Sequence, residues 1–221
     1  ELLDLCDFVL DHNREIAQPV DDSVVSVQGS LLRVARGHAP RTYSIENKKN
    51  MSAMAWGADM KSSLALIHQN QIFHTPYIGT LGSPRSVDRL VETKRKMEDL
   101  FECQCEENLA DLHPSYLSTY VAEECGEASK VQHHLAHALA SLFESPFEKA
   151  LCFVADGTGY GPDGKVWGGE VFQLSEESSQ HIARFENFCI SLGDDSFQTP
   201  EKLFNAFQKG TSLVKTNSIG R

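Results

Sequence analysis

The sequence predicts an α/β fold, because short apolar runs that suit strands alternate with longer amphipathic stretches that suit helices. Six consecutive apolar residues, Ala150 to Ala155, have the length and composition of a buried strand. Ser86 to Glu107 instead carries apolar residues at helical spacing. Between Met51 and Ile78, three apolar segments separated by polar turns predict three successive strands.

Composition excludes several classes of function. At 221 residues the chain is long enough for one large domain or two small ones. The net charge of −11 argues against a nucleic-acid binder, because a polyanion would be repelled. No run approaches the roughly 18 to 20 apolar residues that a membrane span needs. The six cysteines are scattered, which favours reduced thiols in a cytoplasmic protein, and the first residue is not Met, so we expect the natural N-terminus elsewhere.

The N-terminal part predicts a small hairpin followed by a linker. Asp21 to Val27 indicates a turn and a strand, and Leu31 to Ala35 a returning strand after a turn at Gln28–Ser30. Arg33 and Arg36 either face a phosphate or carboxylate or are solvated charges at a strand edge. The polar stretch that ends in Asn47–Asn50 is typical of a linker, so we divide the chain into residues 1–45 and 46–221.

The three strands expected between residues 51 and 78 are typical of one half of an actin-like nucleotide-binding fold. Lys61 lies on the first turn, where it would reach toward a phosphate; the alternative is an exposed turn lysine. After the long helix we expect a short strand over Asn108–Pro114 that ends in polar residues at a sheet edge. Ser115–Cys125 predicts a helix that ends at Gly126. Further strands are expected over Lys165–Phe172, pairing back on Ala150–Ala155, and over His181–Cys189. A last helix is predicted over Glu201–Lys209.

A metal site is predicted where an Ala- and Leu-rich helix precedes the apolar strand. In Val131–Phe143, His133 and His137 are one turn apart and share a face, whereas His134 points about 100° away. Two imidazoles at this spacing can bind one metal ion. Asp156 follows the strand at the end where open α/β sheets place their ligands. The alternative for such a histidine pair on its own is a structural role.

Glycines follow Asp156 directly, and they predict an anion site beside the metal. Gly157, Gly159 and Gly161 surround Thr158, so the backbone there can approach a phosphate and offer its N–H groups. A glycine-rich segment on its own is more often an ordinary turn. The combination of the histidine-bearing helix, the apolar strand, Asp156 and the glycines that follow favours a metal site next to a phosphate site.

Residues 8 to about 198 resemble the HypF-type carbamoyltransferases, which help to build the active site of nickel–iron hydrogenases. Residues up to 45 resemble the C-terminal part of the family's YrdC-like α/β domain, and the rest resembles an actin-like (ASKHA/Kae1-like) half-domain. The most specific motifs are Val131-Gln-His-His-Leu-Ala-His137, Asp156-Gly-Thr-Gly-Tyr-Gly161, Trp167-Gly-Gly-Glu170, Asp111-Leu-His-Pro114 and Ala35-Arg-Gly-His-Ala-Pro40.

The resemblance implies a two-step reaction. In this family, carbamate derived from carbamoyl phosphate is joined to ATP as carbamoyl adenylate, and the carbamoyl group then passes to the C-terminal cysteine of a partner protein, HypE. The implied ligands of a divalent metal, iron or zinc, are His133, His137 and Asp156. The implied nucleotide and phosphate contacts are Lys61, Gly157, Thr158, Gly159, Gly161, Gly168 and Gly169. The implied adenylate contacts in the YrdC-like part are Arg14, Ser23 and Arg36.

The chain departs from the family pattern in three places. Leu135 replaces the middle histidine of the histidine motif, and Ser191-Leu-Gly-Asp194 replaces a Pro-Gly-Gly-Asp run. The stretch before Asn217-Ser-Ile-Gly-Arg221 is shorter than in the family. We therefore expect a fragment, or a form with a deletion after about residue 198, that is inactive alone. The alternatives are an O-carbamoyltransferase that acts on a small-molecule hydroxyl, which has the two domains in reverse order, and a non-catalytic fragment that binds metal or nucleotide.

Overall fold

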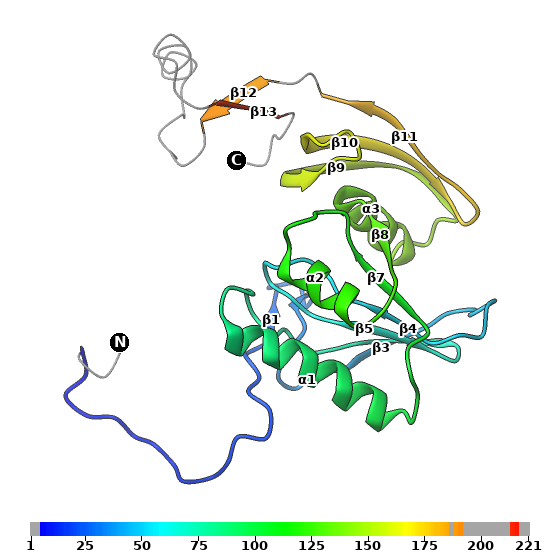
Figure 1. The fold of residues 1–221 in the computed structure, drawn as a ribbon. Helices are drawn as coiled ribbons and strands as arrows, with labels where there is room; N and C mark the ends of the chain where they lie inside the picture. Colours follow the sequence, from blue (N-terminus) through cyan, green and yellow to red (C-terminus); the bar gives the residue numbers. More distant parts are fainter. Residues whose placement is uncertain (1–4, 186–187, 192–212, 217–221) are drawn as a thin grey trace.

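The protein consists of two β-sheets joined through a helix, with a small hairpin and an extended arm at the N-terminus (Figure 1). This computed structural model describes residues 5–185, 188–191 and 213–216, and it describes side chains as far as residue 185. The predicted helix over Glu201–Lys209 lies outside the described residues. Within the described part of the chain, no helix combines the length and the apolar character that a bilayer span requires.

The first sheet has six strands in the order β3-β6-β5-β4-β7-β8. Its first four strands are antiparallel neighbours, and β7 and β8 continue the sheet in parallel with β4. The three strands expected between residues 51 and 78 are present as β4, β5 and β6. The bounds are β3 Arg41–Ser44, β4 Ala53–Ala55, β5 Ala65–His68, β6 Gln71–His74, β7 Glu107–Asp111 and β8 Ala128–Val131.

Two helices, α1 (Pro84–Leu100) and α2 (Leu117–Glu124), cover one face of this sheet (Figure 1). A capping box between Ser83 and Ser86 starts α1, with Pro84 in the first turn, where its missing N–H is not needed. Leu90 and Met97 enter a core to which strands of the sheet, both helices and the segments between them contribute. The buried members of this core are Met54, Trp56, Leu64, Leu66, Phe73, Leu81, Leu90, Met97, Ala110, Val121 and Ala122.

Three expectations for this half differ from the structure. The helix expected to reach Glu107 ends at Leu100, and Glu107 already begins β7. Strand β7 is not at a sheet edge, because it lies between β4 and β8. Arg41–Ser44, expected to be part of a polar connection, forms β3, whose residues alternate between half-buried and exposed as the edge of a sheet allows.

The second sheet is built around the long hairpin of β9 (Lys149–Tyr160) and β10 (Val166–Ser175). Strand β11 (Ser179–Arg184) pairs with the other edge of β10, and β12 (Phe188–Ser191) and β13 (Leu213–Thr216) complete the sheet. The predicted pairing of the segment from residue 165 with the apolar strand is confirmed.

Helix α3 (His133–Phe143) packs on one face of this hairpin over a small core of Ala138, Trp167, Phe172 and Leu174. The expectation that Ala150–Ala155 is buried is wrong for one of its two faces. Cys152 and Val154 pack toward that core, whereas Leu151 and Phe153 are 58% and 75% exposed.

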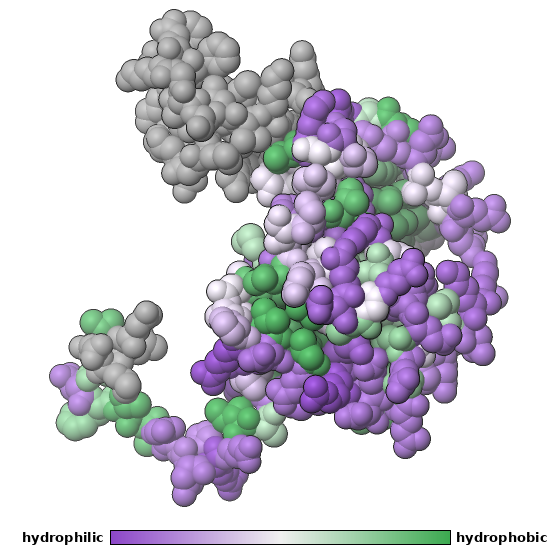
Figure 2. Space-filling view, in the orientation of Figure 1, coloured by the Kyte–Doolittle hydropathy of each residue, from purple (hydrophilic) through white to green (hydrophobic). Residues whose placement is uncertain are grey.

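The N-terminal residues form an arm and a hairpin. Strands β1 (Val24–Val25) and β2 (Leu31–Arg33) pair as predicted, and Gly29 takes the positive φ of 89° that the turn between them needs. The arm before them runs away from the sheets (Figure 1). Phe8 and Leu10 on this arm are almost fully exposed. Figure 2 shows hydrophobic surface along the arm.

Shortening one side chain of α1 should show which face of the helix stabilises the fold. Leu90 is fully buried, so we expect Leu90→Ala to lower the free energy of unfolding by about 2–5 kcal/mol. Leu100→Ala on the same helix is the control, because Leu100 is 68% exposed and its loss should cost less than about 0.5 kcal/mol. Urea unfolding followed by circular dichroism measures both values, and equal losses would contradict the packing described.

Candidate metal centre

The first turn of α3 presents two histidines side by side. Gln132 caps the helix, and its side-chain oxygen accepts a hydrogen bond from Leu135 N–H at 2.8 Å. This cap starts the helix at His133, so that His137 lies one turn further on the same face. The Nε2 atoms of His133 and His137 are 3.2 Å apart. The two rings therefore point at one small volume.

A β-bulge brings Asp156 to the same volume. Ala155 pairs with Gly169 and Gly159 pairs with Trp167, so that residues 156–158 face Gly168 alone. In a regular strand residues 156 and 159 would point to opposite faces, because side chains alternate. With the bulge, both residues contact α3.

The carboxylate of Asp156 lies against the histidine pair. Its Oδ2 is 3.3 Å from His133 Nε2 and 3.8 Å from His137 Nε2. The candidate ligand atoms of the three residues all lie within 4.8 Å of one another. The structure thus brings together the three residues that the sequence singles out as metal ligands, although His133 and Asp156 come from different elements.

Asp111 supports this cluster from the first sheet, although it was not among the residues predicted for the site. It ends β7, is largely buried, and its Oδ2 lies 2.7 Å from Nδ1 of His133. This hydrogen bond is the main reason that the pKa of His133 is raised. It leaves Nε2 facing Asp156, which is the arrangement of a ligand histidine held by a carboxylate. The available signal was the position of Asp111 at the carboxyl end of a strand.

Loss of solvation favours neutral imidazoles in the other two rings. Full burial lowers the pKa of His134 to about 4. The ring of His137 is only partly desolvated by its neighbours, which lowers its pKa, and the adjacent His133 acts in the same direction. A neutral imidazole keeps the nitrogen lone pair that a metal needs. Two imidazoles and one carboxylate around a common point fit a divalent cation, with positions left for other oxygen ligands.

The glycines after Asp156 do not form the open loop that was expected. Gly157, Thr158 and Gly159 belong to β9, and Gly168 and Gly169 belong to β10. A Cβ atom on Gly159 would lie 2.6 Å from Nε2 of His134, and one on Gly161 would collide with the indole ring of Trp167. Close packing explains these two glycines, and their contact with a phosphate stays a prediction.

Lys61 lies in a different cavity. Its backbone has a positive φ of 52°, and it lines a cavity of about 340 Å³ with Arg33, Ser63 and His74 among other residues. None of the three cluster residues is among the described residues that line this cavity. A role of Lys61 at a phosphate therefore stays a prediction.

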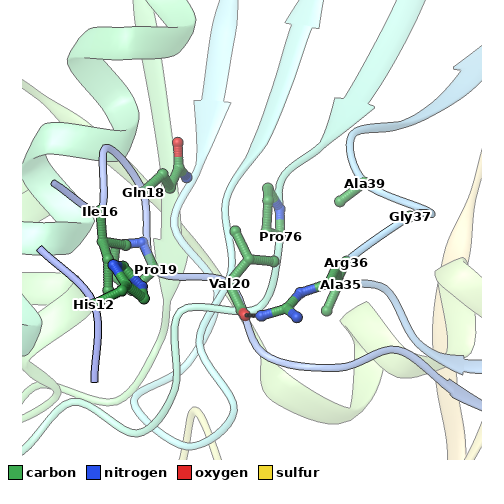
Figure 3. A pocket seen from close by; sticks show the side chains of 10 residues that line it. All are labelled: His12, Ile16, Gln18, Pro19, Val20, Ala35, Arg36, Gly37, Ala39 and Pro76. Carbon is green, nitrogen blue, oxygen red and sulfur yellow. Dashed lines mark hydrogen bonds between the residues drawn. The ribbon is translucent and has the colours of Figure 1, made fainter. Parts of the chain in front are cut away.

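The predicted adenylate contacts are partly brought together. Ser23 Oγ donates a hydrogen bond to the carbonyl of Arg36 at 3.0 Å and accepts one from Ala35 N–H. The Arg36 guanidinium donates to the Val20 carbonyl at 3.1 Å, at an open pocket of about 540 Å³ (Figure 3). Arg14 lies in the N-terminal arm and is not among the residues that line this pocket. Adenylate binding by these residues stays a prediction.

Comparisons with known proteins find relatives of this chain in one family. Residues 48–144 match the family described as the HypF Kae1-like domain, and residues 152–221 match the second subdomain of the carbamoyltransferase Kae1-like domain. The chain is 34% identical to "Carbamoyltransferase HypF" of Synechocystis over 91% of its own length and 27% of the relative. It is 31% identical to "Probable carbamoyltransferase HypF" of Methanocaldococcus jannaschii over 90% of its length and 27% of that relative.

Solved structures show the same fold. A crystal structure of full-length HypF in the phosphate- and nucleotide-bound form is 27% identical, with a TM-score of 0.83, and the match covers 100% of this chain and 40% of that one. HypF of T. kodakarensis matches in fold at a TM-score of 0.77 and 23% identity, over 90% of this chain and 32% of that one.

The fold and the matched regions define a Kae1-like α/β protein. The chain belongs to the HypF family. It spans about a quarter of the length of the curated relatives named above.

Adding one methyl group at Gly159 should disturb the contact between β9 and α3. Because the new Cβ would meet the His134 ring, we expect Gly159→Ala to destabilise the protein by about 1–3 kcal/mol. Gly82→Ala is the matched control, since a Cβ there meets no atom within 4 Å. Thermal unfolding of both variants measures the effect. A Gly159→Ala variant as stable as the control would show that the close approach is wrong.

Proposed function

We propose that this chain forms the metal-holding part of a HypF-type carbamoyltransferase that acts in nickel–iron hydrogenase maturation. In the proposed reaction a carbamoyl group passes from carbamoyl adenylate to the C-terminal cysteine of a HypE-like acceptor protein. One observation carries the proposal: His133, His137 and Asp156 converge inside the region that matches the family's Kae1-like domain. Relatives named as carbamoyltransferases support the reaction class.

The proposed role of the cluster is to hold a divalent iron or zinc ion through His133, His137 and Asp156. When bound, the ion would act as a Lewis acid on phosphate and carbonyl oxygens, where carbamoyl transfer builds negative charge. Asp111 orients His133 by accepting a hydrogen bond from its Nδ1–H, which would leave Nε2 available to hold the ion. Gly157 N–H donates to Oδ1 of Asp156 at 2.6 Å, which leaves Oδ2 facing the histidines.

Substrate would enter from the side of His137. The side chain of this residue is 57% exposed, whereas that of His133 is 20% exposed, so the cluster opens toward solvent at His137. A cavity of about 310 Å³ adjoins it, lined by residues of α3 and β9 that include Ser141, Cys152 and Asp156. An oxygen of a carbamoyl or phosphate group that enters here would meet the ligand atoms directly.

ATP and carbamoyl phosphate are the proposed substrates of the whole protein. A solved relative whose description names bound phosphate and nucleotide supports this assignment. Because the chain spans 27% of its curated relatives, we propose that the complete reaction needs their further regions.

Metal content tests the cluster directly. We expect the purified chain to bind about one equivalent of iron or zinc and the His133→Ala, His137→Ala double variant to bind none, since two of three ligands are lost. The control is a His12→Ala, His38→Ala double variant, which removes two exposed histidines outside the cluster. Elemental analysis after dialysis measures the content. Equal metal in the two double variants would place the ion elsewhere.

Asp111→Asn tests the support of His133. The amide keeps the size of the side chain but loses its charge, and loss of such a partner typically weakens metal binding about 10–100-fold. Asp99→Asn on the exposed face of α1 provides a charge-matched control that should leave affinity unchanged. Competition with a chromophoric zinc chelator gives both affinities. An Asp111→Asn variant with the affinity of the control would exclude this role.

The isolated 221-residue chain should not turn over carbamoyl phosphate and ATP. Release of phosphate and AMP in the presence of both substrates measures turnover, and a full-length HypF serves as the positive control. Robust turnover by the chain alone would contradict the proposal that further regions of the relatives are required.

A further inference from the structure

A third imidazole lies behind the cluster and forms no regular hydrogen bond. His134 is the second residue of α3, and its side chain is completely buried. Among the described residues, neither of its ring nitrogens has a hydrogen-bond partner. Buried polar atoms are almost always paired, because leaving one unpaired is destabilising. An imidazole kept in this position therefore needs a physical reason other than filling space.

The polar atom that His134 faces is an oxygen of the cluster. Its Nε2 lies 3.4 Å from Oδ2 of Asp156, the same oxygen that faces His133 and His137. The other carboxylate oxygen accepts the hydrogen bond from Gly157 N–H. Gly159 leaves room for the imidazole, because any Cβ there would meet the ring. The bulge in β9 therefore places both Gly159 and Oδ2 of Asp156 against the ring of His134.

We propose that His134 is a positioning residue of the metal centre, which donates its Nε2–H to Oδ2 of Asp156 and holds that carboxylate toward the ion. The inference rests on the proposed metal site. A separation of 3.4 Å is longer than a regular hydrogen bond, but catalytic hydrogen bonds commonly tighten only when the ligand is bound. Hydrogen bonds to ligating carboxylates are a general feature of metal centres.

A pair of substitutions separates positioning from packing. His134→Leu keeps an apolar side chain that fills the site but has no donor, whereas His134→Gln places an N–H donor near the position of Nε2. Phe172→Leu is a control for general loosening, since Phe172 lies in the same small core as Ala138 but outside the cluster. Zinc affinity of the full chain is measured by competition with a chromophoric chelator, and thermal unfolding of the zinc-free protein is measured in parallel.

If His134 positions Asp156, His134→Leu binds zinc about 10–100-fold more weakly than the unchanged chain, as expected for loss of such a partner. The same variant unfolds at an equal or higher temperature, because two unpaired buried nitrogens are removed. His134→Gln recovers most of the affinity. Phe172→Leu lowers the unfolding temperature and keeps the affinity.

Three results would overturn the inference, and they differ in whether the proposed metal site also fails. If the unchanged chain binds zinc and His134→Leu binds it equally well, His134 only packs, and the proposed metal site stands. If His134→Leu and His134→Gln lose affinity equally, the N–H donor is not what matters, and the proposed metal site again stands. If the unchanged chain binds no zinc, both the positioning role and the metal site are wrong.

Discussion

Asp156 reaches the first turn of α3 because three residues of β9 oppose the single residue Gly168 of β10. Without that bulge, Asp156 and Gly159 would lie on opposite faces of the strand. With it, the carboxylate meets His133 and His137 while Gly159 makes room for His134. The candidate site therefore depends on a local irregularity of a hairpin rather than on a flexible loop, and its ligands are held by packed elements of both halves of the protein.

The sequence contained what was needed to predict the short-range part of this arrangement. The spacing of His133 and His137 depends only on helical periodicity, and the Ala- and Leu-rich segment forms the expected helix. Repeated apolar segments likewise predicted β4, β5 and β6 and the pairing of β10 with β9. The role of the glycines was harder to predict, because close packing and close approach to an anion both require glycine. The structure shows packing at Gly159 and Gly161, and sequence alone does not separate the two causes.

The remaining part of the site depends on contacts between distant segments. Asp111 reaches His133 because β7 and β8 are parallel neighbours and α3 follows β8 directly, which no local pattern reveals. His134 lies off the face shared by the two predicted ligands, as expected, but the bulge brings Asp156 within 3.4 Å of it. The strand expected to be buried exposes Leu151 and Phe153, because α3 covers one face of it. These three features depend on the register between strands and on which face of a sheet a helix covers.

The most direct test of the central claim is X-ray absorption spectroscopy of the zinc-loaded chain. The fine structure reports the elements bound to the ion and their distances. Two imidazole nitrogens and carboxylate oxygens at about 2.0–2.2 Å, with no sulfur, are expected for His133, His137 and Asp156. A shell of sulfur atoms at about 2.3 Å would place the ion on cysteines, and the metal centre described here would be wrong.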